Sequence, residues 1–458
     1  NRDGMNEEVK VSSGVRYEMD SEDHEFPRLT SMSTDDDEVF EEKGEEETTS
    51  NSKIVKALLT RLPRWPINGG ETGAKLKQKV TSAWFNVKYN SRWVSSAYED
   101  YDKGSVIVLL SKFYSLSGRK ADRENAFSLF TVDYFSRIWL TYRTGFLPLN
   151  QVGSSSSGVT SDCGWGCTLR SAQMMIAQAM IGLHVGREWR WEVDEKEEKM
   201  SREESIHREI ISLFLDDPSS PFSLHSILER EKERVGKWFT PSQAFHLFKG
   251  ALSRSSSPLS SGIELEIVVD GAVDLSELES KTANWTRRLL LVICVRMGLN
   301  EMNEVYSTHI RHLLQSSSSL GIVGGQKNRS VYFVGYTGEE CIYLDPHVSH
   351  SSISSLPSPP SPSDLSSFHC SLLSKFPISS MDPSCAIGFI FNNRKELMDT
   401  VKHLNKAGVL DLEEGEGVSR RNELPIFTVF MKRPPRRDSI HLTQEERDIA
   451  EHNDFNLL

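Results

Sequence analysis

The stretch that most constrains this fold is residues 161–186, SDCGWGCTLRSAQMMIAQAMIGLHVG. From Thr168 onward, apolar residues recur on nearly every face of a helical pattern that ends at Gly186. A helix this apolar must be buried, so the chain has to build a core around it. Gly164 and Gly166 precede the helix and permit turns that a side chain would forbid.

Cys167 stands at the predicted N-terminus of this helix. There the unpaired backbone N–H groups and the helix dipole favour a thiolate, which lowers the cysteine pKa. A thiolate is the nucleophile in acyl transfer, and the same N–H groups can receive an oxyanion. We therefore interpret Cys167 as a candidate nucleophile.

Cys163 forms a pair with Cys167, which leaves a metal clip or a disulfide as alternatives. A zinc site needs about four ligands, and the nearest later candidates are Cys341 and His347, with no second close pair. A Cys163–Cys167 disulfide is sterically awkward across the start of a helix. We predict no metal and no cofactor, and we interpret Cys163 as a thiol near the site without a catalytic role.

A nucleophilic thiol needs a base and a group that orients the base. The best candidates are Asp345 and His347 in YLDPH, residues 343–347. The residue before a proline is extended, and positions i and i+2 of an extended chain point to the same side. The spacing therefore predicts a carboxylate beside an imidazole at a strand end, although a surface histidine beside a turn aspartate has the same pattern.

Strand and helix patterns around these residues predict an α+β domain. Residues 241–252 form a second predicted helix with Pro241 in its first turn. Strands are predicted over 288–297, 330–347 and 385–392, and the middle one is a hairpin that turns at 337–339. A helix-rich first half thus precedes a strand-rich second half, and the site is expected where the two halves meet.

Charge is concentrated at one end of the chain. Residues 1–50 contain 17 of the 65 acidic residues but only 5 of the 53 basic ones. This segment is predicted to be a disordered acidic arm, and the absence of a basic surplus argues against nucleic-acid binding. The six cysteines are irregularly spaced, and no secretory signal or membrane-spanning run is visible. We expect free thiols and a cytoplasmic location.

Four regions are expected. The acidic arm (1–50) precedes a basic amphipathic linker (51–75), whose residues 53–66 could dock on the core, rest on an anionic membrane or act as a transit segment. A catalytic domain follows (76–430), with serine-rich surface loops. The last region is a C-terminal tail (431–458) that ends in Phe455 and Leu458 with F-x-x-L spacing.

The blocks DCGWGCTLRSAQMMIAQAM and YLDPH, with SRIWLTYRTGF, KWFTPSQ and GLNEMNEVY, resemble the autophagins. These are papain-like cysteine proteases that process ubiquitin-like autophagy modifiers, and the resemblance is closest to their long, acidic-armed subgroup. It implies that Cys167 is the nucleophile, His347 the base and Asp345 the group that orients it. It further implies that Tyr142 stabilises the oxyanion, and that Trp238 clamps the terminal glycine of the substrate in a cleft walled by Trp165.

The resemblance also implies the reaction and the partners. A monomeric enzyme would cut modifier precursors after glycine and remove modifiers from phosphatidylethanolamine, with peripheral contact to autophagic membranes. The tail residues Phe455 and Leu458 resemble a short modifier-binding motif. The alternatives are a modifier-binding adaptor that acts through this tail, and a deubiquitinase-like thiol protease.

Two positions depart from the family pattern. Cys294 stands where many members have a proline on the loop that opens for substrate, and Lys327 replaces the usual proline after GG. Both departures leave open the relative rates of priming and delipidation.

Overall fold

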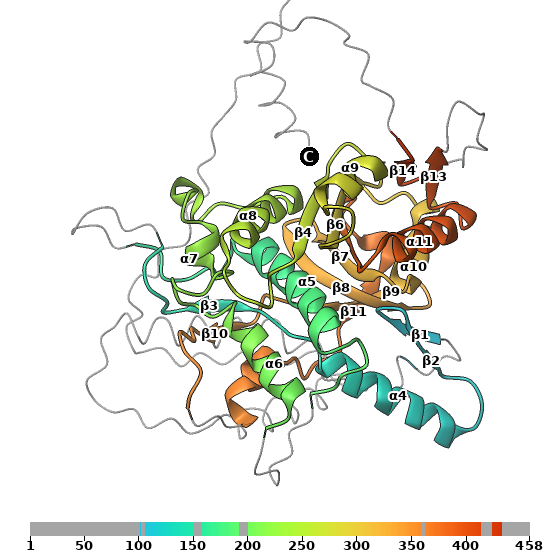
Figure 1. Ribbon diagram of the computed structural model, residues 1–458. Coiled ribbons are helices and arrows are strands. Elements are labelled where there is room, and N and C mark those ends of the chain that lie inside the picture. Colours follow the sequence, from blue (N-terminus) through green and yellow to red (C-terminus); the bar gives the residue numbers. More distant parts are fainter. Residues whose placement is uncertain are drawn as a thin grey trace, which may run out of the picture. The chain divides into compact units, whose positions relative to one another are not determined.

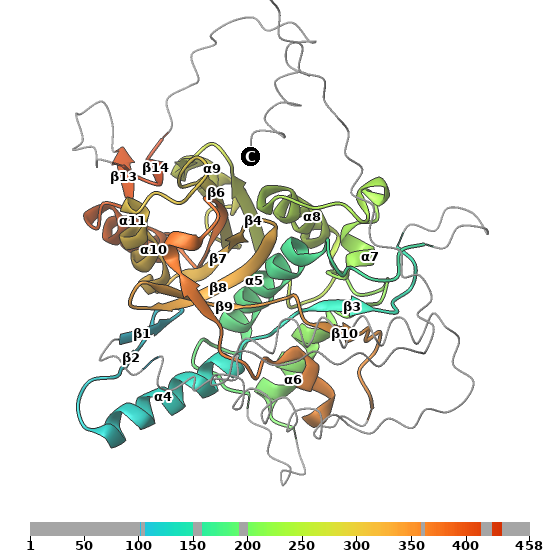
Figure 2. The same ribbon diagram turned by 180° about the vertical axis from the view of Figure 1, so that it is seen from behind.

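The computed structural model describes residue 101 and residues 106–149, 158–191, 200–358, 362–413 and 424–432. Four predicted features lie outside these residues: the acidic arm, the linker with its 53–66 segment, the start of the catalytic domain at residue 76, and the tail beyond residue 432 with Phe455 and Leu458. No helix in the described ranges is long and apolar enough to cross a membrane. The α+β class is confirmed, because helices cover both faces of a mixed sheet (Figures 1 and 2).

The helices are α4 (Lys120–Phe135), α5 (Cys167–His184), α6 (Arg202–Ser212), α7 (Leu224–Ile227), α8 (Pro241–Arg254), α9 (Leu275–Lys281), α10 (Val305–Gln315) and α11 (Arg394–Lys406). Short 3-10 turns are η1 (Lys232–Arg234), η2 (Pro362–Phe368) and η3 (Ile378–Ser380). The strands are β1 (Val106–Leu109), β2 (Lys112–Ser115), β3 (Tyr142–Thr144), β4 (Ile263–Val268), β5 (Ala272–Asp274), β6 (Arg288–Arg296), β7 (Ser319–Gln326), β8 (Arg329–Thr337), β9 (Glu340–Leu344), β10 (Ser349–Ser351), β11 (Lys375–Pro377), β12 (Ser384–Phe391), β13 (Leu410–Glu413) and β14 (Phe427–Phe430).

The main sheet runs in the order β11-β9-β8-β7-β12-β6-β4, and β1 and β2 join along β8. Neighbouring strands are antiparallel except for the β4–β6 pair. Strand β6 shows why the sheet is central. Its apolar residues alternate between a core on the α5 side, with Leu290 and Val292, and a core on the α10 and α11 side, with Leu291 and Ile293. Side chains of a strand alternate between the two faces, so an uninterrupted apolar run fits a strand buried on both.

Helix α5 crosses one face of this sheet (Figure 1). Its residues from Cys167 to Ile181 are all buried, which confirms the prediction from the apolar pattern. Helix α8 begins as predicted at Pro241, behind a capping box in which Thr240 and Gln243 bond each other's backbone N–H groups. Such a box satisfies two N–H groups that a helix start otherwise leaves without partners.

The predicted hairpin is confirmed as β8 and β9, which turn at Gly338 with a positive φ of 54°. Two smaller sheets complete the described elements: a parallel β3–β10 pair, and a three-stranded sheet in the order β13-β14-β5. The β3–β10 pair matters for the site, because it holds Tyr142 opposite Ser349, two residues after His347.

Gly335 lets β1 approach β8. A Cβ at this glycine would lie 2.1 Å from the backbone oxygen of Val108 and 3.2 Å from the Cα of Leu109. Backbone atoms cannot move aside as the end of a side chain can, so the pairing depends on the missing side chain.

We predict that Gly335→Ala lowers the free energy of unfolding by about 1–3 kcal/mol through overpacking. Gly182→Ala is the matched control, because a Cβ there meets nothing closer than 3.9 Å. The control should be neutral or stabilise helix α5 by about 0.5–1 kcal/mol. Denaturant unfolding followed by circular dichroism measures both values, and equal stability of the two variants would contradict the prediction.

Candidate active site

The loop before α5 positions Cys167 at the first residue of the helix, directly after Gly166. Gly164 has a φ of +89°, as expected for a turn that favours glycine. Gly166 is required for a different reason than the one we predicted, because its φ is an ordinary −85°. A Cβ on Gly166 would lie 2.6 Å from Oδ2 of Asp162, so the close approach of this carboxylate excludes a side chain.

The segment after β9 brings His347 to Cys167. Nδ1 of His347 lies 2.5 Å from Oδ1 of Asp345, and the backbone N–H of His347 donates to the same oxygen over 3.1 Å. The side chain of His347 is hydrogen-bonded to the thiol of Cys167. The three residues predicted from two distant motifs are therefore in contact, with the carboxylate and the imidazole side by side as the spacing indicated.

Electrostatics favour an ionised pair at this contact. Burial alone raises the pKa of the Cys167 thiol, but the hydrogen bond and charge of His347, the backbone N–H of Ser330 and the Tyr142 hydroxyl outweigh it, so the pKa is lowered. Burial lowers the pKa of His347, yet Asp345 and Cys167 raise it to about 9. Both shifts favour the thiolate–imidazolium form of the pair more than the isolated side chains would.

Tyr142 lies on β3 with its ring edge-on to His347, at a centroid distance of 5.3 Å. Its hydroxyl is hydrogen-bonded to Cys167, and its backbone N–H donates to the oxygen of Pro346 over 2.9 Å. The predicted oxyanion residue is thus beside the sulfur. A phenol there can donate to a negative charge that develops next to the thiol.

The two tryptophans occupy different surroundings. Trp165 is buried, and its indole N–H donates to the backbone oxygen of Ser161 over 3.0 Å. Trp238 lies between η1 and α8 with 49% of its surface exposed, whereas Cys167 is 1% exposed. The structure therefore places Trp165 in the loop that carries Cys167 and leaves Trp238 as an exposed aromatic side chain.

Cys163 differs from Cys167 in the way the sequence suggested. Its thiol donates to the hydroxyl of Ser349 over 3.4 Å, and burial raises its pKa. All six cysteines are free thiols. The four others, Cys294, Cys341, Cys370 and Cys385, are buried core residues, and burial raises the pKa of each.

One expectation about Cys294 is wrong. We expected this residue on a loop that opens for substrate, but it lies within the central strand β6, buried between β4 and β12. The apolar run of β6 continues through this position because both faces of the strand are covered.

Sequence reasoning missed two residues that contact Asp345. The indole N–H of Trp139 donates to the backbone oxygen of Asp345 over 2.7 Å. The guanidinium of Arg329 pairs with Oδ2 of Asp345. Trp139 lies within the SRIWLTYR block, in which only Tyr142 had been assigned a role, and Arg329 belongs to no recognisable motif.

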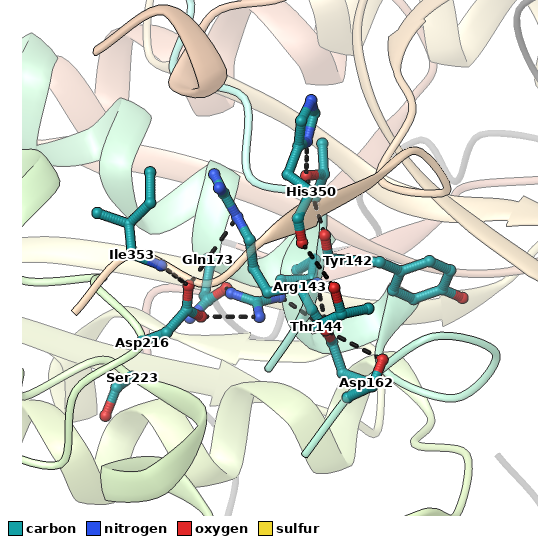
Figure 3. Close-up of polar contacts among 12 residues, drawn as sticks. Tyr142, Arg143, Thr144, Asp162, Gln173, Asp216, Ser223, His350 and Ile353 are labelled. Carbon is teal, nitrogen blue, oxygen red and sulfur yellow. Dashed lines mark hydrogen bonds and ion pairs between the residues drawn. The ribbon is translucent and has the colours of Figure 1, made fainter. Parts of the chain in front are cut away.

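The sequence also did not reveal a buried ionic cluster, formed by Arg143, Asp162, Arg170 and Asp216. Figure 3 labels Arg143, Asp162 and Asp216 of this cluster. Asp162 accepts from the backbone N–H of Arg143 and from Nε of Arg170, each over 2.7 Å. Nη2 of Arg170 donates to Asp216 over 3.1 Å. Burial alone would lower the pKa of Arg170, but the two carboxylates raise it.

The ionic cluster also reaches the segment after His347. The backbone N–H of Ile353 donates to Asp216 over 3.0 Å, and Nη1 of Arg143 donates to the oxygen of Ser351 over 3.0 Å. The Tyr142 ring points away from Arg143 and Asp216 of the cluster (Figure 3). The cluster therefore supports the loop of Cys167, the strand of Tyr142 and the segment after His347 together.

Comparisons with known proteins agree with this geometry. Residues 127–403 match the model of the peptidase C54 catalytic domain. The chain is 36% identical to "Cysteine protease atg-4.2" of Caenorhabditis elegans, over 84% of this chain and 78% of that protein. It is 31% identical to "Cysteine protease ATG4C" of Xenopus laevis, over 74% and 87%, and 28% identical to the human "Cysteine protease ATG4C", over 82% and 93%.

We predict that Asp162→Ala lowers the free energy of unfolding by about 3–5 kcal/mol, because it leaves buried Arg170 with one carboxylate fewer. The control is Asp399→Ala, which removes a surface partner of Lys395 and should change stability by less than about 0.5 kcal/mol. Thermal and denaturant unfolding test this. Similar losses in the two variants would mean that the ionic cluster contributes no more than a surface pair.

We also predict that Cys167 titrates as a thiolate below the ordinary thiol value of 9.0. The ultraviolet thiolate absorbance of the wild type minus that of Cys167→Ser reports this titration without any substrate. The Cys163→Ser variant should leave the difference unchanged. A midpoint at or above 9.0 would contradict the assignment of an ion pair.

Proposed function

The chain belongs to the peptidase C54 family, the autophagins, and is an autophagy-related cysteine protease; we propose that it cleaves ubiquitin-like autophagy modifiers after their C-terminal glycine and releases them from phosphatidylethanolamine. The single observation that carries the proposal is the chain of contacts from Cys167 through His347 to Asp345. A lowered thiol pKa at a helix N-terminus is what acyl transfer by cysteine needs.

In the proposed reaction, the Cys167 thiolate attacks the carbonyl carbon of the terminal glycine. The carbonyl oxygen becomes an oxyanion that accepts from the Cys167 backbone N–H and from the Tyr142 hydroxyl. His347 gives its proton to the leaving amine, the C–N bond breaks, and a thioester joins Cys167 to the glycine. His347 then takes a proton from water, whose oxygen attacks the thioester carbon. The C–S bond breaks, which releases the glycine carboxylate and restores the Cys167 thiolate.

Asp345 has an orienting role in this proposal. Its contact with Nδ1 of His347 places the other ring nitrogen, Nε2, on the side of the sulfur and stabilises the imidazolium. The carboxylate remains ionised throughout, because His347 and Arg329 hold its pKa well below the usual range against the opposing effect of burial.

Substrate selection is proposed to depend on the two tryptophans. Exposed Trp238 would cover the glycine tail, and Trp165 would form a wall of the cleft, so that a β-carbon is excluded. The tail residues Phe455 and Leu458 would bind the modifier as a second contact. We further propose that the protein works as a monomer in the cytoplasm and touches autophagic membranes only peripherally.

The decisive test uses purified full-length chain and a modifier precursor that extends beyond the glycine. Cys167→Ala should abolish cleavage, because no nucleophile remains. Asp345→Asn should keep the fold and reduce kcat by about 10⁴-fold through the wrong imidazole tautomer. Cys163→Ser should cleave like the wild type, and full turnover by Cys167→Ala would refute the mechanism.

Two further substrates separate the alternatives. A modifier coupled to phosphatidylethanolamine on vesicles tests deconjugation, and a ubiquitin precursor tests a deubiquitinase. A wild type that binds modifiers through its tail but cleaves none of the three substrates would instead be an adaptor.

A further inference from the structure

Arg329 occupies the side of Asp345 that does not face His347. Oδ1 of the carboxylate accepts from His347, and Oδ2 pairs with Nη2 of the guanidinium. The side chains of Arg329 and Asp345 are 22% and 12% exposed. Partial burial makes such a charge-assisted contact stronger and more rigid than a surface ion pair.

Tyr343 restrains Arg329 from the next strand. The guanidinium carbon of Arg329 lies 5.6 Å from the centre of the Tyr343 ring, and Nη2 lies 3.4 Å from its hydroxyl. Tyr343 is fully buried on β9. A guanidinium stacked over a fixed ring has few other rotamers, so Arg329 can hold the carboxylate in one orientation.

The residue after Arg329 acts on the nucleophile, because the backbone of Ser330 helps to lower the pKa of the Cys167 thiol. Arg329 and Ser330 open β8 directly after the β7–β8 turn, where Gln326 pairs with Arg329 and Gly325 with Ser330. The side chain that pairs with Asp345 thus belongs to the same short segment as a backbone group that influences the thiol.

We propose that Arg329 is a positioning residue of the cysteine protease site, which fixes the Asp345 carboxylate against His347. The proposal rests on the catalytic roles given above for Cys167, His347 and Asp345. Arg329 itself touches no reacting atom, and it acts through the carboxylate that it places.

The positive charge of Arg329 also affects the pKa of His347. A cation on the distal oxygen of Asp345 opposes the imidazolium of His347 and therefore reduces the rise of its pKa. Removing the cation should raise the pKa of His347 further, and the alkaline loss of the ion pair should move to higher pH. The other titratable groups that face the Asp345–His347 pair are Cys167 from α5, Tyr142 from β3, Tyr134 from α4, Tyr343 from β9, and Cys370.

The experiment compares Arg329→Gln and Arg329→Lys with the control Arg311→Gln. Arg311 pairs with Glu339 at the far end of the same hairpin, on the surface. Each variant is assayed for precursor cleavage across pH, for the thiolate absorbance of Cys167, and for thermal unfolding. The thiolate measurement needs no substrate, so it reports on positioning even without turnover.

For Arg329→Gln we expect kcat to fall roughly 10- to 100-fold, because the Asp345 carboxylate is misplaced. The alkaline limb of the pH–rate profile should move to higher pH by roughly 0.5 to 1 unit, because a positive charge is lost. Arg329→Lys should restore the limb, because it keeps the charge, but only part of kcat, because an ammonium lacks the planar fork. Arg311→Gln should match the wild type in every readout.

A double variant tests whether Arg329 acts through Asp345. In the Asp345→Asn background, Arg329→Gln should lower kcat much less than it does in the wild type, because the contact between residues 329 and 345 is already altered. Wild-type kcat and an unmoved pH profile in Arg329→Gln would overturn the proposal. The proposal would also be overturned if the loss of kcat only matched the fraction of unfolded protein and the alkaline limb of the pH–rate profile did not move.

The outcome also separates this proposal from the proposed function. If the wild type cleaves no modifier precursor, but the thiolate titration shifts in Arg329→Gln and returns in Arg329→Lys, the substrate assignment fails and the positioning role stands.

Discussion

Four buried charges constrain this site more than any other feature. Arg143 lies on β3, Asp162 and Arg170 flank the start of α5, and Asp216 follows α6. An unpaired charge in the buried position of any of them would cost several kcal/mol. Each segment therefore has to arrive with its partner in place. Asp162 belongs to the loop that carries Cys167, and Asp216 binds the segment after His347. The ionic cluster therefore fixes both segments and so helps to set the distance between nucleophile and base.

The reactivity of Cys167 follows from its partners and not from exposure. Its sulfur is more buried than that of Cys163, and burial by itself raises the pKa of both thiols. Only Cys167 has an imidazole, a phenol and a backbone N–H directed at it. The lowered thiol pKa of Cys167 therefore depends on α5, β3, β8 and the segment after β9 being assembled, which couples nucleophilicity to folding.

Most of the fold could be predicted from local patterns. The apolar period of α5, the uniform run of β6 and the turn at Gly338 each depend on neighbours in sequence, and Asp345-Pro346-His347 carries its geometry within three residues. The ionic cluster could not be predicted, because its pairs join residues as distant in sequence as Arg143 and Asp216 and obey no period. The prediction for Cys294 failed for a related reason. A comparison with the family pattern at one position does not show that the residue lies in β6, between β4 and β12.

The contact between Arg329 and Asp345 could not be predicted, because it depends on a shift in strand register. Counting back from the turn, Thr337 opposes Glu340 and Gly335 opposes Ile342, but a bulge at Val334 then sets Phe333 opposite Tyr343 instead of Leu344. The bulge shifts the first half of β8 by one residue against β9, and a shift of one residue changes which face each side chain takes. The shift occurs beside Gly335, where β1 pairs with β8. The close approach of β1 to Gly335 thus occurs beside the bulge, and the bulge sets the register of Arg329 and Asp345. The sequence patterns of β8 and β9 do not reveal this bulge.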